Sequence, residues 1–420
     1  MYDAWVEAAE NGLLAGVAMI DMSAAFDVVD IEILLKKCEV LNIQSESLQW
    51  LQSYLSQRKQ SVYMSGHFSS VVTLEAGVPQ GSILGPLLYT IYTLDFPEVV
   101  HQDDCPYKYE AQSTMFRTMC TECGGICCYA DDSTYSVVAA TTMELSLKLE
   151  EKFKVMSSYL SENRLCINSE KTHLLIMSTR QKKRKTTEAM ATLNTGHEII
   201  LPSRSEILLG FKIHENMNFS EHLLDSKDSL IKTLNKRIGA LKQIKKVASF
   251  KARLNIANGI VMSKILYLLP LYAGCAEYLL KAIQTKQTEA MRQVTGRRWI
   301  VPGKKYVSTV ELLKECGWLS IRQLSFYTTV LSVHEALVNK TPENIYRILT
   351  SGREHVTRRA VKHPVKRTCV DEARLTMASS LYRWRGHQQH SALPDFLKDE
   401  DDLKVFKCAL KSWVLENVPI

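Results

Sequence analysis

Long apolar stretches are scarce in this chain of 420 residues. The longest, Ile265–Ala273, is less than half of the roughly 20 residues that a helix needs to cross a bilayer. A secretory leader is also missing, since Met1–Leu14 carries Asp3, Glu7 and Glu10 where a leader has a basic start and an apolar run. The sequence therefore predicts an intracellular protein, nuclear or cytoplasmic, with no membrane partner.

A strong overall charge is absent as well. The 52 Lys and Arg residues against 45 Asp and Glu residues leave a net charge of +7, which over this length says little about partners. With 46% hydrophobic and 23% charged residues, the composition is that of a globular protein and excludes disordered, collagen-like and coiled-coil chains. We find no internal repeat.

The eleven cysteines are unevenly placed. Six stand alone along the chain, as small buried side chains do, and the other five crowd into one polar segment. In that segment Cys120 and Cys123 have the spacing of half a zinc knuckle, and Cys105 with either His101 or Cys127 could complete a tetrahedral Zn²⁺ site. Reduced thiols in a loop are the alternative, which the sequence leaves open.

The first hundred residues combine β-prone runs with helical patterns. Gly16–Asp21 is a short apolar run ended by a carboxylate, which predicts a buried strand with that carboxylate at its tip. Helical spacing follows over Ile31–Cys38 and Leu48–Leu55, and Gln60–Leu74 predicts a hairpin. A further helix is expected over Ile83–Ile91, with its apolar residues facing the core.

A second hairpin carries two carboxylates at its tip. Strands are expected over Ile126–Ala130 and Thr134–Val138, joined through Asp131-Asp132-Ser133. Thr141 and Glu144 form a capping box that opens a long amphipathic helix, and another strand follows that helix. The resulting β-α-β-β-α-β order predicts an α+β fold, in which helices cover one face of an antiparallel sheet.

Asp21 and the Asp131-Asp132 pair would lie side by side if their strands are neighbours in one sheet. Three carboxylates facing one point repel one another unless cations neutralise them, and such oxygen ligands suit Mg²⁺, with Mn²⁺ as a substitute. The chemistry that follows is two-metal phosphoryl transfer, which activates a 3′-hydroxyl and stabilises the leaving pyrophosphate. For the pair taken alone, a solvated turn is the ordinary alternative.

Three motifs occur in a fixed order: Asp21–Phe26, Val78–Gly85 and the Tyr-Ala-Asp-Asp box of Tyr129–Asp132. In these residues, and over most of its length, the chain resembles the reverse transcriptases of non-LTR (LINE-type) retrotransposons. The resemblance implies an RNA-directed DNA polymerase that adds deoxynucleotides to a DNA primer on an RNA template. It also implies a right-hand polymerase palm, with a ferredoxin-like sheet, followed by an α-helical thumb.

The resemblance assigns roles to the carboxylates and to the residue that senses the sugar. It makes Asp21, the backbone carbonyl of Met22, Asp131 and Asp132 the ligands of two metal ions. It makes Phe26 the residue under the sugar that excludes a 2′-hydroxyl.

Four more palm residues are assigned in the same way. Gln80 and Gly81 would contact the incoming nucleotide and the template, and Tyr129 would lie near the primer end. Lys171 would protonate pyrophosphate, against the ordinary alternative of a surface lysine after a strand.

Farther along, the resemblance covers primer and duplex contacts. Gly210 and Phe211 belong to a hairpin similar to a primer grip, and Lys236 and Arg237 lie on basic helices similar to a thumb that holds the duplex by its phosphates. The basic cluster Arg180–Lys185 could be a solvated loop, a nucleic-acid contact or a nuclear-import patch.

The expected domains are a palm at 1–218 with a cysteine-rich insertion at 97–126, a thumb at 219–305, and a C-terminal helical region at 306–420 without assigned chemistry. Only 20 residues precede Asp21, so the family's fingers and endonuclease are expected to be missing.

One rival hypothesis is a fragment that only binds nucleic acid. Another is a two-metal nuclease, which accounts for the carboxylates but not for Val78–Gly85 or Phe26. The oligomeric state is left open.

Overall fold

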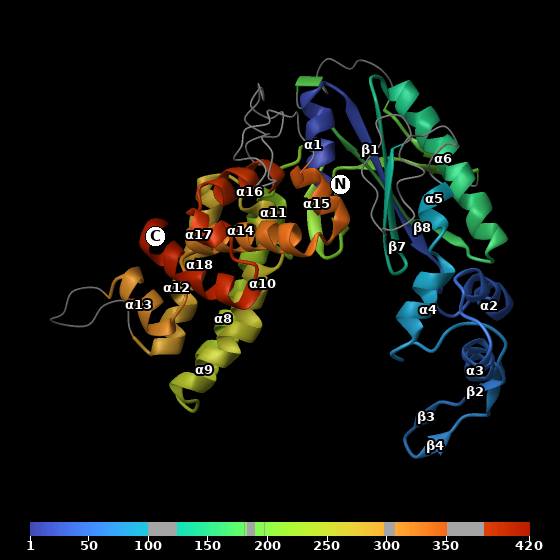
Figure 1. Ribbon diagram of the computed structural model, residues 1–420, viewed down its shortest axis with the longest axis horizontal. Coiled ribbons are helices and arrows are strands. Elements are labelled where there is room, and N and C mark those ends of the chain that lie inside the picture. Colours follow the sequence, from blue (N-terminus) through green and yellow to red (C-terminus); the bar gives the residue numbers. More distant parts are fainter. Residues whose placement is uncertain (100–123, 180, 183–189, 197, 298–306, 351–381) are drawn as a thin grey trace. The chain divides into compact units, whose positions relative to one another are not determined.

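The computed structural model describes residues 1–99, 124–179, 181–182, 190–196, 198–297, 307–350 and 382–420 (Figure 1). Two compact units make up the chain, one containing residues 3–209 and the other residues 210–420. Among the described residues, no helix is long and apolar enough to cross a membrane. The expected domain boundaries near residues 218 and 305 stay predictions.

The first unit mixes helices and strands. Its helices are α1 (Tyr2–Glu10), α2 (Ile31–Val40), α3 (Glu46–Leu55), α4 (Gly85–Tyr92), α5 (Phe96–Val99) and α6 (Thr142–Glu162). Its strands are β1 (Leu14–Met22), β2 (Arg58–Gln60), β3 (Tyr63–Met64), β4 (His67–Phe68), β5 (Val72–Leu74), β6 (Gly125–Tyr129), β7 (Asp132–Ala139), β8 (Ile167–Met177), β9 (Leu193–Asn194), β10 (Ile199–Ile200), β11 (Pro202–Ser203) and β12 (Ser205–Leu208).

The central sheet has the strand order β11-β8-β1-β7-β6. β8, β1, β7 and β6 pair antiparallel with their neighbours, and β11 joins the edge parallel to β8. The predicted strand at Gly16–Asp21 is the middle of β1, which lies in the middle of the sheet. The predicted β-α-β-β-α-β order and the α+β class are therefore confirmed.

Helix α6 covers one face of this sheet, as Figure 1 shows. The Thr141 hydroxyl oxygen accepts a hydrogen bond from the Glu144 N–H at 3.2 Å, which confirms the predicted cap. Leu145 and Leu149 pack so close to β1 that a Cβ at Gly16 would lie 3.0–3.3 Å from their side chains. A small residue in β1 thus lets the helix approach the sheet.

One detail of the sequence prediction is wrong. Ile83 and Leu87 were expected to face the core, but Ile83 is 96% exposed and Leu87 is also exposed. The cause is that α4 begins only at Gly85, because the Ser82 hydroxyl donates to the Pro79 carbonyl and accepts from the Gly85 N–H, which holds a turn there. The predicted hairpin at Gln60–Leu74 is confirmed, although its ladder is interrupted between the pair β2 with β5 and the pair β3 with β4.

The second unit is almost entirely helical. After the strand β13 (Phe211–His214), it contains the π-helical turns η2 (Glu221–Asp225) and η3 (Asn258–Met262). Its α-helices are α8 (Leu230–Ile244), α9 (Phe250–Ala257), α10 (Ser263–Leu266), α11 (Leu269–Tyr272), α12 (Glu277–Thr295), α13 (Thr309–Cys316), α14 (Ile321–Asn339), α15 (Glu343–Thr350), α16 (Tyr382–Ser391), α17 (Asp395–Lys398) and α18 (Leu403–Asn417). Leu241 of α8, Met291 of α12 and Leu312 of α13 share one buried cluster.

We expect Leu149→Ala to destabilise the first unit by about 2–5 kcal/mol, because the fully buried side chain leaves a cavity between α6 and β1. The matched control is Leu147→Ala on the same helix, where the side chain is exposed and the loss should stay within about 0.5 kcal/mol. Urea unfolding of the two variants beside the parent chain measures the difference, and equal midpoints would contradict this packing.

Candidate active site

Asp21 lies near the end of β1, between the strands β7 and β8. Ile20 pairs with Ser133 of β7, so the next position along the strand brings Asp21 beside Asp132. On the other side Asp21 pairs with Asn168 of β8. Because successive side chains of a strand point to opposite faces, and Ile20 belongs to the core under α6, Asp21 points to the other face of the sheet.

Asp131 and Asp132 come from the tight turn between β6 and β7. Tyr129 pairs with Asp132, which leaves Ala130 and Asp131 as a two-residue turn in which Ala130 has a φ of 53°. Desolvation by burial, followed by the charges of Asp131 and Asp21, raises the pKa of Asp132. Asp132 therefore lies close enough to Asp131 and Asp21 to be repelled by both.

The carboxylates do not form a ready-made cage. In the part of the chain that the structure describes, no three His, Cys, Asp or Glu side chains surround a position for a cation. Mg²⁺ needs no such cage, since it keeps several waters and is bound through one or two carboxylates together with substrate phosphates. An all-oxygen donor set with unbalanced negative charge fits this kind of ion.

Lys171 reaches the carboxylates through an irregularity in β8. Between Asn168 and His173 this strand advances five positions while β1 advances two, so β8 bulges. The Thr172 hydroxyl donates to the Asn168 carbonyl at 2.8 Å and closes the bulge. From it, the exposed side chain of Lys171 extends until its Nζ lies 3.4 Å from Oδ2 of Asp21. The bulge therefore brings the Lys171 side chain to the edge of the group of three carboxylates.

Phe26 lies in the loop after β1 and stacks on Tyr89 of α4, with ring centroids 4.5 Å apart. The Tyr89 hydroxyl donates to Met22 Sδ at 3.3 Å, and burial followed by the charge of Asp131 raises the pKa of Tyr89 well above its usual range. Tyr89 thus supports both Phe26 and the strand that carries Asp21. Sequence reasoning missed it, although Gly85, Leu88, Tyr89 and Tyr92 have the i, i+3, i+4, i+7 spacing of a buried face.

The turn that contains Gln80 and Gly81 is fastened to the loop after β1. The Gly77 N–H donates to the Val29 carbonyl and the Val78 N–H to the Phe26 carbonyl, both at 2.8 Å. Gly77 has a φ of 87°, and a Cβ there would lie 2.6 Å from the Asp27 carbonyl oxygen. Only glycine fits this position, because both its backbone conformation and its surroundings exclude a side chain.

Gln80 and Gly81 stand at the exposed end of this turn. Gln80 donates from Nε2 to Asp27 Oδ1 at 3.0 Å, a contact that sequence reasoning missed. Gly81 has a φ of 80° and open space where a Cβ would stand. The structure thus brings both residues, with Phe26, to the same loop region, while their contacts with a nucleotide stay predictions.

In the second unit, Gly210 has a φ of 74° and directly precedes β13. The Phe211 ring is buried, with its centroid 4.0 Å from that of His222, so a primer contact by Phe211 could involve only its main chain. Nδ1 of His222 accepts the backbone N–H of Lys212 at 3.2 Å, which ties β13 to η2. Burial lowers the pKa of His222 to about 4, so the imidazole is neutral and able to accept.

The two predicted thumb contacts on α8 differ in their surroundings. Lys236 is exposed. Arg237 is half-buried and donates from Nη1 to the Ile260 carbonyl at 2.6 Å, which holds η3 against α8. Lys236 is therefore the better placed of the two to reach a phosphate, and the structure gives Arg237 a packing role.

The predicted zinc site falls largely outside the described residues. Cys105, Cys120 and Cys123 lie there with most of the insertion, as does most of the basic cluster at 180–185. Cys127 lies in β6, is not in a disulfide, and has its pKa raised by burial. The zinc hypothesis stays a prediction.

Comparisons with known proteins match the amino-acid sequence to a family. A family model described as reverse transcriptase (RNA-dependent DNA polymerase) matches residues 6–213. The chain is 25% identical over 294 residues to the RNA-directed DNA polymerase from mobile element jockey of Drosophila melanogaster, covering 70% of this chain and 30% of that protein. It is 25% identical over 299 residues to the probable RNA-directed DNA polymerase from transposon BS of the same fly, covering 71% and 31%.

The chain thus spans about 30% of the length of the curated relatives that it matches. Among solved structures, it is similar to telomerase from Candida albicans with a TM-score of 0.39 and 13% identity, over 82% of this chain and 53% of that one. A likeness of that size carries no argument about function.

We expect protonation of His222 to destabilise the second unit. The pKa of His222 is about 4 in the folded protein, below its ordinary value of 6.5, so its contribution to stability is complete above about pH 6.5 and is lost as the pH falls towards 4. In His222→Asn the amide oxygen can accept the same N–H without titrating. The fall in the urea midpoint between about pH 7 and about pH 4.5 should therefore be smaller than in the parent. The control is His67→Asn, an exposed histidine of the first unit; equal falls in parent and His222→Asn would contradict the assignment.

Proposed function

The chain belongs to the reverse transcriptase family, in the branch of the non-LTR retrotransposons, and we propose that it performs RNA-directed DNA synthesis. One observation carries the proposal: Asp21, Asp131 and Asp132 gather at one end of the sheet, with Lys171 beside them, inside the segment that the family model matches. Burial, followed by the charges of Asp131 and Asp21, raises the pKa of Asp132, and such a group of carboxylates next to a lysine suits a site for cations and phosphates.

Divalent metal ions are the cofactors of this family, and we propose Mg²⁺, with Mn²⁺ as a substitute. Asp21, the Met22 carbonyl, Asp131 and Asp132 would hold the ions. Bound there, such ions supply charge neutralisation at the triphosphate and a lowered pKa of the primer 3′-hydroxyl. The substrates would be an RNA template, a DNA primer and deoxynucleoside triphosphates.

Lys171 is the proposed acid of the reaction. The 3′-hydroxyl of the primer would lose its proton to water as its oxygen bonds to the α-phosphorus. The bond from that phosphorus to pyrophosphate would break, and the ammonium group of Lys171 would pass a proton to the departing oxygen. Its Nζ lies 3.4 Å from Asp21 Oδ2, which keeps the charged group close to the carboxylates until a triphosphate binds. The exposed side chain is long enough to turn towards that phosphate.

Phe26 is the proposed gate that excludes a 2′-hydroxyl of the sugar. Tyr89 stacks on one face of its ring, with the ring centroids 4.5 Å apart, so the Phe26 side chain cannot move away in that direction. Gln80 and Gly81, fastened to the same loop, would contact the nucleotide and the template, and the exposed Tyr129 would lie near the primer end. In the second unit, Gly210 and the exposed Lys236 would contact the primer and the duplex phosphates, so binding should weaken with salt.

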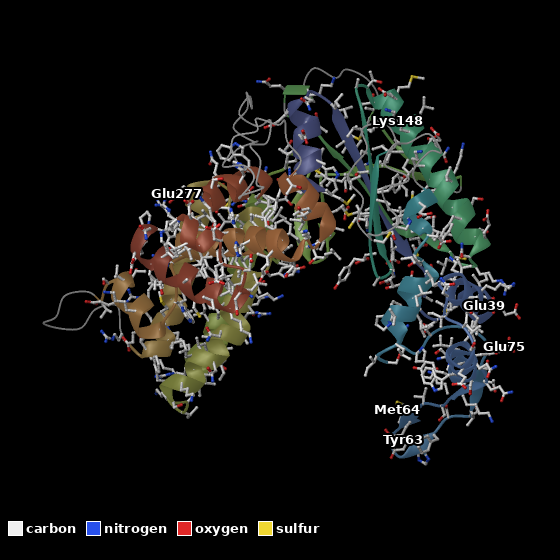
Figure 2. The ribbon with its side chains drawn as sticks, in the orientation of Figure 1. Glu39, Tyr63, Met64, Glu75, Lys148 and Glu277 are labelled. Carbon is white, nitrogen blue, oxygen red and sulfur yellow. The ribbon has the colours of Figure 1, made fainter. Side chains whose placement is uncertain are left out.

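Primer extension tests the proposal. On a poly(A) template with an oligo(dT) primer, Mg²⁺ and dTTP, the parent chain should extend the primer. Asp131→Asn/Asp132→Asn should lose at least about a hundredfold in rate, because the charge that holds the cations is removed. The matched control is Glu32→Gln/Glu39→Gln, which removes two exposed carboxylates of α2 and should leave the rate unchanged; Figure 2 labels Glu39. No extension by the parent, with primer-template still bound, would mean a chain that only binds nucleic acid.

The sugar gate has its own test. Phe26→Ala should raise the ratio of kcat/KM for a ribonucleotide to that for a deoxynucleotide by on the order of tenfold or more, because space for a 2′-hydroxyl opens. Phe26→Tyr keeps a ring over Tyr89 and should keep the parent's discrimination. Unchanged discrimination in Phe26→Ala would remove this residue as the gate.

A further inference from the structure

An arm of two short hairpins, residues 58–74, carries apolar side chains outside the core of its unit. β2 pairs with β5 at its base, and β3 pairs with β4 at its tip. The exposed apolar side chains are those of Val62, Tyr63, Met64, Phe68, Val71 and Val72. Figure 1 shows the arm extending away from the sheet of its own unit, and Figure 2 labels Tyr63 and Met64 at its tip. Isolated hairpins are marginal in water and exposed apolar patches mark interaction sites, so a partner is expected here.

Two aromatic rings form a platform at the tip of the arm. Tyr63 and Phe68 are directly paired across β3 and β4, and their ring centroids lie 4.7 Å apart. Tyr63 is 62% exposed and Phe68 is 73% exposed. Rings held side by side on a backbone ladder, with their outer faces open, are suited to stacking against other flat rings.

The charge of the arm excludes some partners and favours others. Between Glu46 and Glu75 the sequence has no acidic residue, whereas Arg58 and Lys59 lie at the base of the arm. Lys59 is exposed. An acid-free surface that combines a lysine with open aromatic rings matches the charge of a phosphate backbone and the flat faces of unpaired bases.

The base of the arm is tied to the proposed template site. Nη2 of Arg58 donates to the Ala76 carbonyl at 2.9 Å and to the Gly77 carbonyl at 2.6 Å. These carbonyls begin the turn that carries Gln80 and Gly81. A strand held by the arm would therefore be held by an element fastened to the turn next to Phe26.

We propose that the arm binds single-stranded RNA, with bases stacked on Tyr63 and Phe68 and the phosphate backbone beside Lys59. The proposal rests on the proposed function only for the identity of that strand as the template. A duplex would not fit this contact, because its bases are stacked on one another and show no free face. The aromatic platform thus selects unpaired RNA, and the lysine adds affinity without reading sequence.

The test measures binding of the full chain to a fluorescent single-stranded oligo(U), without metal or nucleotide. Tyr63→Ala/Phe68→Ala should weaken the affinity about twenty-five-fold or more, since each of the two lost stacking contacts is worth about fivefold or more. Tyr63→Phe/Phe68→Tyr keeps both rings and should bind like the parent. Met143→Ala/Leu147→Ala removes two exposed apolar side chains of α6 from the same unit and should also bind like the parent.

A salt series separates stacking from charge. The alanine double variant should shift the plot of log Kd against log salt without changing its slope, whereas Lys59→Ala should lower the slope by about 0.7, the value for one phosphate contact on a single strand. Unchanged affinity of the alanine double variant would overturn the proposal. If light scattering then showed that the variant self-associates differently from the parent, the arm would be assigned to contact with a second copy of the chain.

Because no turnover is needed, this test is independent of primer extension. Loss of RNA affinity in a chain that does not extend primers would support the arm and refute the polymerase. If the parent chain extends primers and the alanine double variant binds RNA like the parent, the result would support the polymerase and refute the proposed role of the arm.

Discussion

The pairing of β1 with β7 and β8 is the constraint on which the site depends. Side chains alternate along a strand, so Ala18 and Ile20 enter the core under α6 while Asp21 points to the opposite face. A slip of one residue would turn those core residues away from α6 and turn the carboxylate towards it. The hydrophobic core and the geometry of the candidate site are thus held by the same register, and neither can change without the other.

The same register also brings three negatively charged carboxylates together, and their repulsion is unfavourable. Asp132 is partly desolvated and faces two like charges, which is why its pKa is raised. The fold offsets part of this repulsion with Lys171, which reaches Asp21 only because β8 bulges at this point of the sheet. Carboxylates that repel one another favour the binding of cations, since cations relieve the repulsion, and bound cations can in turn attract phosphates.

Hydrogen bonds to the backbone fix the loops next to this sheet as well. The Gly77 turn is attached on one side to the loop of Phe26 and on the other, through Arg58, to the base of the arm. Phe26 in turn stacks on Tyr89 of α4. The residues proposed to contact sugar, template and unpaired RNA therefore belong to one continuous set of contacts within the first unit.

By itself, the sequence determined which elements form, because apolar periodicity and capping are local: β1, α6 and the Thr141 cap lie where their patterns predicted. It also named the carboxylates, through the order of its motifs. It failed at Ile83, where a side-chain hydrogen bond of Ser82 delays the start of α4, and it could not foresee that Tyr89 supports Phe26. Only the tertiary structure decided that Lys171 meets Asp21, because that contact depends on the pairing and bulging of strands far apart in the chain, which no local pattern encodes.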